Sequence, residues 1–183
     1  MVQHLILITG MPGAGKTTLA NTFKQNGFCS MSMGDVIRDL AYERELEPSS
    51  SVLGNLAKEI RSQGGDAAVA NLCVDKIKKM SIDKVVIDGI RSIAEVRAFK
   101  AQFNTKLVAI FASFNTRYTR LQNRRRSDDP IDKETFNMRD HRELGFSMGH
   151  AIALSDYMIV NESSIINFEK EFYILLEWLE KDD

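Results

Sequence analysis

Short runs of apolar residues alternate along the chain with longer stretches whose apolar residues recur at helical spacing. A run such as 5–8 (LILI) is typical of a buried strand, whereas the spacing of Leu19, Ala20 and Phe23 indicates a helix with one buried face. Strands that alternate with helices favour a parallel sheet with right-handed crossovers and ligands at the carboxyl ends of the strands. We predict strands over 3–9, 28–32, 84–88, 106–112 and 157–160, and helices over 15–25, 34–46, 51–64, 66–77, 92–99, 115–126, 132–144 and 164–181.

Glycine, proline and small polar residues mark the ends of several predicted elements. Gly27 ends the first helix, and Pro48 with the serines at 49–51 predicts a break followed by an N-cap. Gly64 closes the helix that follows, and Asp66 is expected to cap the next helix. These signals separate helices without dividing the chain into domains.

Length and composition fit a single α/β domain. The chain has 183 residues, enough to bury a full core, and its net charge of −1 gives no general attraction to nucleic acid or anionic lipid. Cys29 and Cys73 are far apart and form no C-x-x-C pattern, so neither a disulfide framework nor a zinc site is indicated. No apolar run has the length of a membrane span, and no charged leader precedes an apolar stretch at the N-terminus. We therefore expect a cytoplasmic protein.

A glycine-rich segment between the first strand and the first helix is the strongest functional signal. Its sequence, GMPGAGKTT at 10–18, satisfies the pattern G-x-x-x-x-G-K-[ST] in a strand–loop–helix context. Glycines let backbone N–H groups surround a phosphate, and the helix directs its positive N-terminal end to the same point. We predict binding of a nucleotide's phosphates, with Lys16 on the β- and γ-phosphates and the Thr17 hydroxyl on Mg²⁺. The predicted phosphate-binding residues are Gly10, Met11, Pro12, Gly13, Ala14, Gly15, Lys16, Thr17 and Thr18.

An acidic residue, Asp88, closes the predicted strand 84–88. In a protein with this phosphate loop, such an acid is the expected partner of the metal, usually through the metal's water shell. The alternative is a strand-end turn or helix N-cap formed by Asp88 and Gly89. We favour the metal role.

Asp35 and Arg38 form a second candidate pair after the second predicted strand. They lie three residues apart and therefore on one face of the helix that begins there. The start of that helix lies near the phosphate loop if the second strand neighbours the first. Arg38 then suits an anionic group of a second substrate. An exposed salt pair of little energetic value is the equally weighted alternative.

Seven arginines gather between residues 117 and 142, on two predicted helices separated by the break SDDP at 127–130. Arginine recognises phosphate with two parallel hydrogen bonds and stabilises a phosphoryl group in transfer, and the break suits the hinge of a lid. A solvated basic helix and a local nucleic-acid surface are the alternatives. Helical spacing puts Arg117, Arg120 and Arg124 on one face of the first helix. Arg125 and Arg126 must point elsewhere and are weaker candidates. Arg139 and Arg142 lie on the second helix.

In its order of motifs, nearly the whole chain resembles the adenylate kinase and nucleoside-monophosphate kinase group of P-loop proteins. The segment 32–38 (SMGDVIR) resembles their T-G-D-x-x-R, with Met33 in place of threonine, and 88–91 (DGIR) resembles their D-G-F-P-R without the proline. The segment 53–60 resembles their acceptor-nucleotide helices. More closely, the chain resembles the archaeal adenylate-kinase-related proteins, and 153–161 is similar to a segment of dephospho-coenzyme A kinases.

The resemblance implies a role for each candidate side chain. An arginine of the T-G-D-x-x-R type holds the acceptor's phosphate, and the arginines of the lid close over the phosphates. The implied substrate-binding residues are Asp35, Arg38, Asp88 and Arg91, the metal-binding residues are Thr17 and Asp88 (through water), and the catalytic residues are Lys16, Arg117, Arg120, Arg124, Arg139 and Arg142. Asn161 and Glu162 are weaker candidates for contacts with the donor base.

The expected fold is α/β: a three-layer α/β/α P-loop fold with a five-stranded parallel sheet, an acceptor-binding helical insert and a short helical lid. The core comprises 1–33, 82–114 and 155–183, the insert 34–81, and the lid region 115–154.

The expected function is transfer of the γ-phosphoryl group of ATP, with Mg²⁺, to a small acceptor. A nucleoside monophosphate such as AMP is the favoured acceptor and therefore the favoured partner. A kinase of the dephospho-coenzyme A or nucleoside type, an ATPase acting on RNA or ribosomes, and a nucleotide sensor without turnover are the alternatives. The sequence leaves the oligomeric state open.

Overall fold

The computed structural model describes residues 4–124, 129 and 132–181. In this part of the chain, five strands form one sheet in the order β2-β3-β1-β4-β5, and every neighbouring pair is parallel. The predicted parallel sheet is confirmed. The strands are β1 (His4–Thr9), β2 (Cys29–Ser32), β3 (Lys84–Ile90), β4 (Thr105–Phe111) and β5 (Tyr157–Val160).

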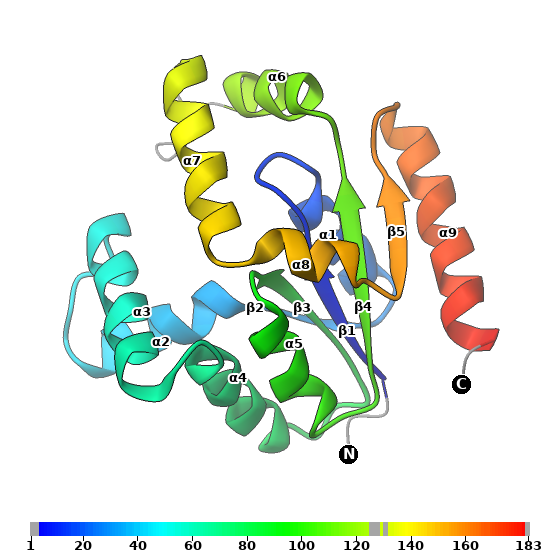
Figure 1. Ribbon diagram of the computed structural model, residues 1–183. Helices are drawn as coiled ribbons and strands as arrows, with labels where there is room; N and C mark the ends of the chain where they lie inside the picture. The colour runs from blue at the N-terminus through cyan, green and yellow to red at the C-terminus, as the bar shows by residue number, and fades with distance from the viewer. Residues whose placement is uncertain (1–3, 125–128, 130–131, 182–183) are drawn as a thin grey trace.

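Helices cover both faces of the sheet, which confirms the three-layer α/β/α architecture (Figure 1). Helices α1 and α9 pack on one face, and α2, α4, α5 and α8 pack on the other. The helices are α1 (Lys16–Gln25), α2 (Met33–Glu43), α3 (Ser50–Gly64), α4 (Ala68–Lys78), α5 (Ile93–Lys100), α6 (Phe114–Arg124), α7 (Lys133–Gly145), α8 (Met148–Ala153) and α9 (Ile165–Lys181).

The apolar run of β1 is buried on both faces because alternate side chains of a strand point to opposite sides. Leu5 and Leu7 join the core beneath α4 and α5, whereas Ile6 and Ile8 join the core beneath α1 and α9. This double burial explains why the central strands are continuously apolar. It also fixes where the residues that follow β1 emerge, at the carboxyl edge of the sheet.

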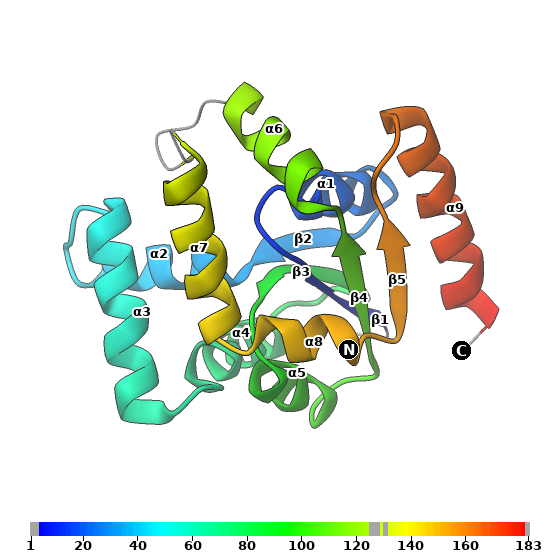
Figure 2. The same cartoon turned by 45° about the horizontal axis from the view of Figure 1, so that its top comes forward.

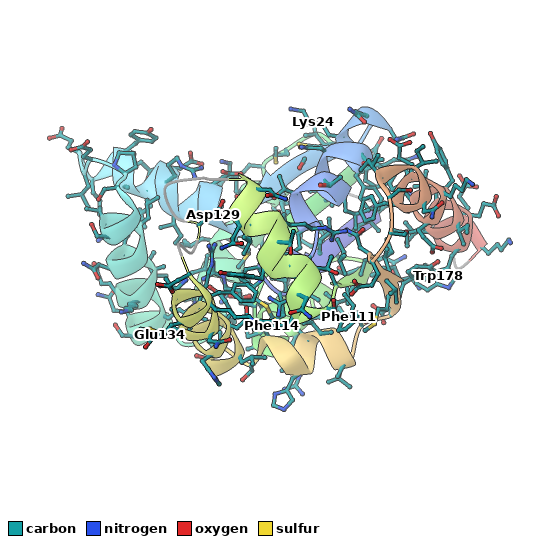
Figure 3. All side chains as sticks on the ribbon, turned by 90° about the horizontal axis from the view of Figure 1, so that it is seen from above. Lys24, Phe111, Phe114, Asp129, Glu134 and Trp178 are labelled. Carbon is teal, nitrogen blue, oxygen red and sulfur yellow. The ribbon has the colours of Figure 1, made fainter. Side chains whose placement is uncertain are left out.

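Helices α6 and α7 lie over that carboxyl edge, above the ends of β1 and β4 (Figures 1 and 2). Seen from above, they lie between α3 on one side of the molecule and α9 on the other (Figure 3). The predicted lid region thus lies over the edge where the loop of residues 10–15 emerges. Among the residues that the structure describes, no helix combines the length and apolar character needed to cross a membrane.

The position of β2 differs from the sequence-based expectation. We expected the helix carrying Asp35 to start near the phosphate loop if the second strand neighboured the first. Instead β2 pairs with β3, with Ser32 opposite Asp88, so β3 separates β2 from β1. Strand order depends on long-range pairing, which the local hydrophobic pattern does not encode. The start of α2 therefore lies one strand further from the loop.

Three local predictions also have definite outcomes. Ser49 caps α3 as expected, because its hydroxyl accepts a hydrogen bond from the N–H of Val52 at 3.3 Å. The cap predicted at Asp66 is wrong: Ala67 occupies the N-cap of α4, without a side-chain hydrogen bond. Helix α8 was not predicted, since a six-residue segment is too short to show a helical period.

Candidate active site

The glycine-rich loop connects the carboxyl end of β1 to the first turn of α1 (Figure 1). Gly10 has a φ of 145°, and a Cβ atom there would lie 2.5 Å from the carbonyl oxygen of Ile110 on β4. Gly15 has a φ of 116°, and a Cβ atom there would lie 2.5 Å from Nδ2 of Asn161. The backbone conformation therefore favours glycine at both positions; packing against backbone adds to this at Gly10, whereas at Gly15 the Asn161 side chain would have to shift.

The first turn of α1 presents the groups that suit a phosphate. Gly15 precedes it without a side-chain cap, so within the described residues the backbone N–H groups of this turn face the loop uncapped. The Nζ atom of Lys16 donates to the carbonyl oxygen of Gly10 at 2.7 Å. Burial lowers the pKa of Lys16, whereas the negative charges of Asp88 and Glu143 oppose this shift. The lysine thus lies between the loop and two carboxylates.

A cleft of about 430 Å³ opens above this loop. Its walls come from the loop, α1, the end of β3, α6, α7 and α8, so segments that are far apart in the chain meet here. Positive charge dominates the lining, which suits a polyphosphate. Its basic side chains are those of Lys16, Arg91, Arg120, Arg124 and Arg139, and Glu143 is its one acid among the described residues.

Asp88 lies beside Ile8 of β1, just before Gly89, where the register of β1 and β3 shifts. The strand continues to Ile90 and does not end at Asp88 as predicted. Burial raises the pKa of Asp88, whereas the charge of Lys16 and hydrogen bonds from the Gly89 N–H and the Thr17 hydroxyl oppose this shift. Its buried Oδ1 atom has no hydrogen-bond partner among the described residues. This carboxylate and the threonine hydroxyl are oxygen ligands of the type that Mg²⁺ takes, so the residues fit the metal.

A second cavity, of about 270 Å³, adjoins the loop on the side of β5 and α9. Asn161 contributes to it and donates from Nδ2 to the carbonyl oxygen of Ala14 at 2.8 Å. Its Oδ1 atom accepts from the Arg120 guanidinium at 3.2 Å, and the other terminal nitrogen of Arg120 has no partner among the described residues. Glu162 does not line this cavity: its carboxylate accepts from the N–H of Ser113 and the hydroxyl of Thr116 at the start of α6. Of the two weaker candidates, only Asn161 is therefore positioned for a donor base.

Arg117 has a different position from the one that we expected for a lid arginine. It is buried, and it forms two hydrogen bonds with the carboxylate of Asp140 on α7, at 2.8 and 2.5 Å. It also donates to the carbonyl oxygens of Pro12 at 3.1 Å and Ala112 at 3.2 Å, and it lies over the ring of Phe136. These contacts occupy the donors that a phosphoryl group would need. Arg117 is also absent from the cleft lining, so these contacts favour a structural role, in which it connects α6, α7 and the loop, over the catalytic role that we predicted.

The other arginines of the cluster divide by position. Arg124 and Arg139 line the cleft, and both pair with Asp129, which is labelled in Figure 3. Arg142 is exposed, pairs with Glu143 at 3.2 Å and is absent from the cleft lining. The weaker candidates at 125 and 126, Arg125 and Arg126, and most of the predicted hinge at 127–130 lie outside the described residues.

Asp35 and Arg38 do not line this cleft. The Asp35 carboxylate and Ser32 form a capping box at the start of α2, with the Ser32 N–H donating to Asp35 at 2.8 Å. Arg38 is half-exposed and donates to Asp35 at 2.6 Å. Partial burial alone would raise the pKa of Asp35, but the hydrogen bonds from Ser32 and Arg38 hold it below its usual value. The pair thus matches the simpler alternative, a local ion pair that also caps a helix.

Arg91 lines the cleft just after the end of β3, and two residues that were not predicted as site residues, Glu143 and Phe146, contact it. Glu143 is buried on α7, and one of its oxygens lies 3.5 Å from Nε of Arg91. The Arg91 guanidinium also lies over the ring of Phe146, 5.7 Å from its centroid. A glutamate in a polar helix and an isolated phenylalanine carry no recognisable sequence signal, so only the fold reveals them.

The fold resembles solved P-loop kinases over nearly the full chain. The crystal structure of shikimate kinase from Bacteroides thetaiotaomicron has a TM-score of 0.65 and 18% identity, covering 96% of this chain and 98% of that one. A Thermus thermophilus protein has a TM-score of 0.67 and 16% identity, covering 98% of this chain and 99% of that one. At such identities the likeness shows the fold alone. With the loop and the cleft, it defines the chain as a P-loop protein with a kinase-like fold.

Sequence comparison identifies the family. Residues 6–144 match the family model described as an AAA domain. The chain is 41% identical over 175 residues to the UPF0200 protein of Hyperthermus butylicus, covering 96% of this chain and 94% of that protein. It is 45% identical over 162 residues to the UPF0200 protein of Methanocaldococcus jannaschii, covering 87% and 82%. The chain belongs to the UPF0200 family. These archaeal relatives agree with the archaeal likeness stated above, whereas the adenylate kinase specificity stays a prediction.

Proposed function

We propose that this protein is an ATP-dependent phosphotransferase that moves the γ-phosphoryl group to a small acceptor, with a nucleoside monophosphate as the favoured acceptor. The observation that carries the proposal is the cleft itself. A phosphate loop and arginines that follow β3 or lie on α6 and α7 line one cavity of about 430 Å³, and Asp88, an acid suited to Mg²⁺, directly precedes Gly89 of its lining. A protein that only binds a nucleotide needs the loop, whereas arginines converging from the opposite wall suit a group in transfer.

In this proposal the triphosphate of ATP occupies the loop, with Lys16 on its β- and γ-phosphates. The adjoining cavity at Asn161 and Arg120 receives the donor base, because it opens from the same loop at Gly15. Thr17 and Asp88 hold Mg²⁺, which would neutralise charge on the phosphates. Arg120 and Arg139 face the cleft from α6 and α7 and offset the charge that develops on the phosphoryl group.

The acceptor approaches from the side of Arg91. This arginine belongs to the segment that resembles D-G-F-P-R and lines the cleft beside Gly89, whereas Arg38 does not line it. A phosphate acceptor needs no general base because its own pKa is low. We expect Arg91→Ala to raise the KM of the acceptor by roughly tenfold or more, the effect of losing a hydrogen bond to a charged group. An unchanged acceptor KM contradicts this assignment.

A hydroxyl acceptor is the second candidate. Glu143 supports it, because a carboxylate in the cleft is a general base of the kind that a hydroxyl needs. Some structural neighbours are shikimate kinases, which is a further reason to test this acceptor class. A nucleic-acid surface receives less support, because Arg117 and Arg124 of the basic cluster are paired with acids.

The proposed domain roles follow from these positions. The region 34–81 is proposed as the acceptor-binding insert, and 115–154 as the lid over the donor phosphates. The proposed partners are ATP with AMP or another monophosphate.

A phosphotransfer screen tests the proposal. The protein is incubated with ATP, Mg²⁺ and single acceptors: the four ribonucleoside monophosphates, deoxynucleotides, dephospho-coenzyme A and shikimate. ADP release above the rate without acceptor identifies the substrate. Lys24→Ala, an exposed lysine on the same helix as Lys16, is the control for Lys16→Ala. ADP release that no acceptor increases, but that RNA stimulates, refutes the kinase proposal in favour of an ATPase.

A further inference from the structure

Glu143 is the one acidic side chain among the described residues that line the cleft. It lies on α7 and is 3% exposed, so its carboxylate is almost fully withdrawn from water. An unpaired carboxylate at such a position is costly, and a negative charge opposes the binding of phosphates. The presence of this acid in a positively charged cleft therefore needs a physical reason.

Two arginines that reach into more exposed surroundings pair with Glu143. Nε of Arg91 lies 3.5 Å from one carboxylate oxygen, and a terminal nitrogen of Arg142 lies 3.2 Å from the other. Strong ionic hydrogen bonds have distances of about 2.7–2.9 Å, so both contacts are loose. The side chains of Arg91 and Arg142 are 42% and 63% exposed. A second anion can therefore reach these guanidinium groups and compete with Glu143.

Arg91 is held in place independently of Glu143. Its backbone N–H donates to the buried carboxylate of Glu95 at 2.7 Å, and its guanidinium lies over the ring of Phe146. Arg61 lies over the same ring at 5.6 Å and pairs with Glu95 at 3.3 Å. Phe146 thus contacts two guanidinium groups, and both arginines bond the buried Glu95 carboxylate, Arg61 through its guanidinium and Arg91 through its backbone N–H. Removing the charge of Glu143 leaves this framework intact, with Arg91 still directed toward the cleft.

We propose that Glu143 is the internal counter-ion of the acceptor site, and that an oxyanion of the acceptor replaces its carboxylate on Arg91. This inference rests on the proposed function, because it assumes that the acceptor occupies the side of the cleft near Arg91. It narrows the acceptor to a molecule with a compact oxyanion, either a phosphomonoester or a carboxylate. Glu143 acts through Arg91 and is a specificity-determining residue that disfavours acceptors without this charge.

The test is Glu143→Gln, which keeps the shape of the side chain and removes its charge. We expect the KM of an oxyanion acceptor to fall by about threefold to tenfold, as for the loss of a competing partly exposed ion pair. The KM of ATP should change less, because Lys16, which binds the phosphates of ATP, interacts more strongly with Asp88 than with Glu143. Glu177→Gln is the control, since it removes the charge of an exposed glutamate on α9, outside the cleft lining and outside the proposed insert and lid. Thermal unfolding checks that each variant is folded.

A double-mutant cycle tests whether Glu143 acts through Arg91. In an Arg91→Ala background, the additional Glu143→Gln change should leave the acceptor KM unaltered. Equal effects on the KM of ATP and of the acceptor would refute the proposal, because they indicate a general charge effect. A large loss of kcat without a fall in acceptor KM would also refute it and would assign Glu143 as the general base.

Direct binding separates this inference from the kinase proposal. Calorimetric titrations of both proteins with AMP and with shikimate test a phosphomonoester and a carboxylate, respectively. Tighter binding of either probe to Glu143→Gln than to the wild type supports the counter-ion even if no acceptor is turned over. Unchanged or absent binding of both probes in the variant overturns it, whatever the phosphotransfer screen finds.

Discussion

Replacing Arg117 with methionine removes one half of a buried ion pair that connects two helices over the cleft. The side chains of Arg117 and Asp140 are 7% and 13% exposed, and two hydrogen bonds join them. Methionine keeps much of the apolar stem but supplies no donor. The variant therefore leaves the Asp140 carboxylate without its partner in a poorly hydrated site between α6 and α7.

The expected magnitude follows from these contacts. Breaking a buried ion pair by removing one partner costs about 3–5 kcal/mol, a large part of the roughly 5–15 kcal/mol that stabilises a typical domain. The double variant Arg117→Met/Asp140→Leu removes both charges and should recover much of this loss. It still lacks the hydrogen bonds to the carbonyl oxygens of Pro12 and Ala112, at about 0.5–1.5 kcal/mol each. We therefore expect the double variant to remain about 1–3 kcal/mol less stable than the wild type.

Urea unfolding followed by circular dichroism measures these free energies. Arg97→Met is the control, because Arg97 is exposed on α5, and it should change stability by less than about 0.5 kcal/mol. A wild-type stability for Arg117→Met, combined with a large loss of turnover, would refute the structural role and restore the catalytic one. A double variant less stable than the single variant would refute the reasoning about the buried charge.

Four further predictions concern the loop and α2. Lys16→Ala should abolish ADP release in the phosphotransfer assay, and full activity would contradict the role of the loop. Gly15→Ala should lower stability by more than about 1 kcal/mol, because a Cβ atom conflicts with both the φ angle and Nδ2 of Asn161; an unchanged urea midpoint would contradict this. Ser32→Ala should cost about 1 kcal/mol as the loss of a cap. Because the folded-state pKa of Asp35 is lowered, its charged carboxylate stabilises the protein above the unfolded-state pKa, and this contribution to stability is lost below about pH 4. If the wild type is more stable than Asp35→Asn by an amount that does not shrink in acid, this prediction is contradicted.

Much of the architecture could be predicted because it depends on short-range patterns. The doubly buried strands read as apolar runs, and Leu19, Ala20 and Phe23 are all buried as their spacing predicted. The phosphate loop could be recognised because Gly10 and Gly15 are needed for their positive φ angles, which are a local property, as well as for packing. The wrong prediction at Asp66 also came from a local signal. Aspartate has a strong preference for the N-cap, but Ala67 occupies the N-cap of α4.

The role of each arginine was beyond the reach of the sequence. Arg117, Arg120 and Arg124 share one helical face, yet the first is buried against Asp140, the second contacts Asn161 and the third pairs with Asp129. Their spacing is equivalent, and only the position of α6 relative to α7 and β5 distinguishes them. Charge periodicity predicts a face of a helix, but it does not predict what that face contacts.

The sequence by itself determined the alternation of strands and helices, the phosphate loop and the acid near the end of β3, since each depends on neighbours within a few positions. Only the tertiary structure decided the strand order and the position of α7. With this arrangement, Asp35 and Arg38 do not line the cleft, whereas α7 contributes Glu143 to it. The physical reason is that pairing and packing between distant segments depend on the shape and burial of whole elements. The side chains of one short segment do not contain that information.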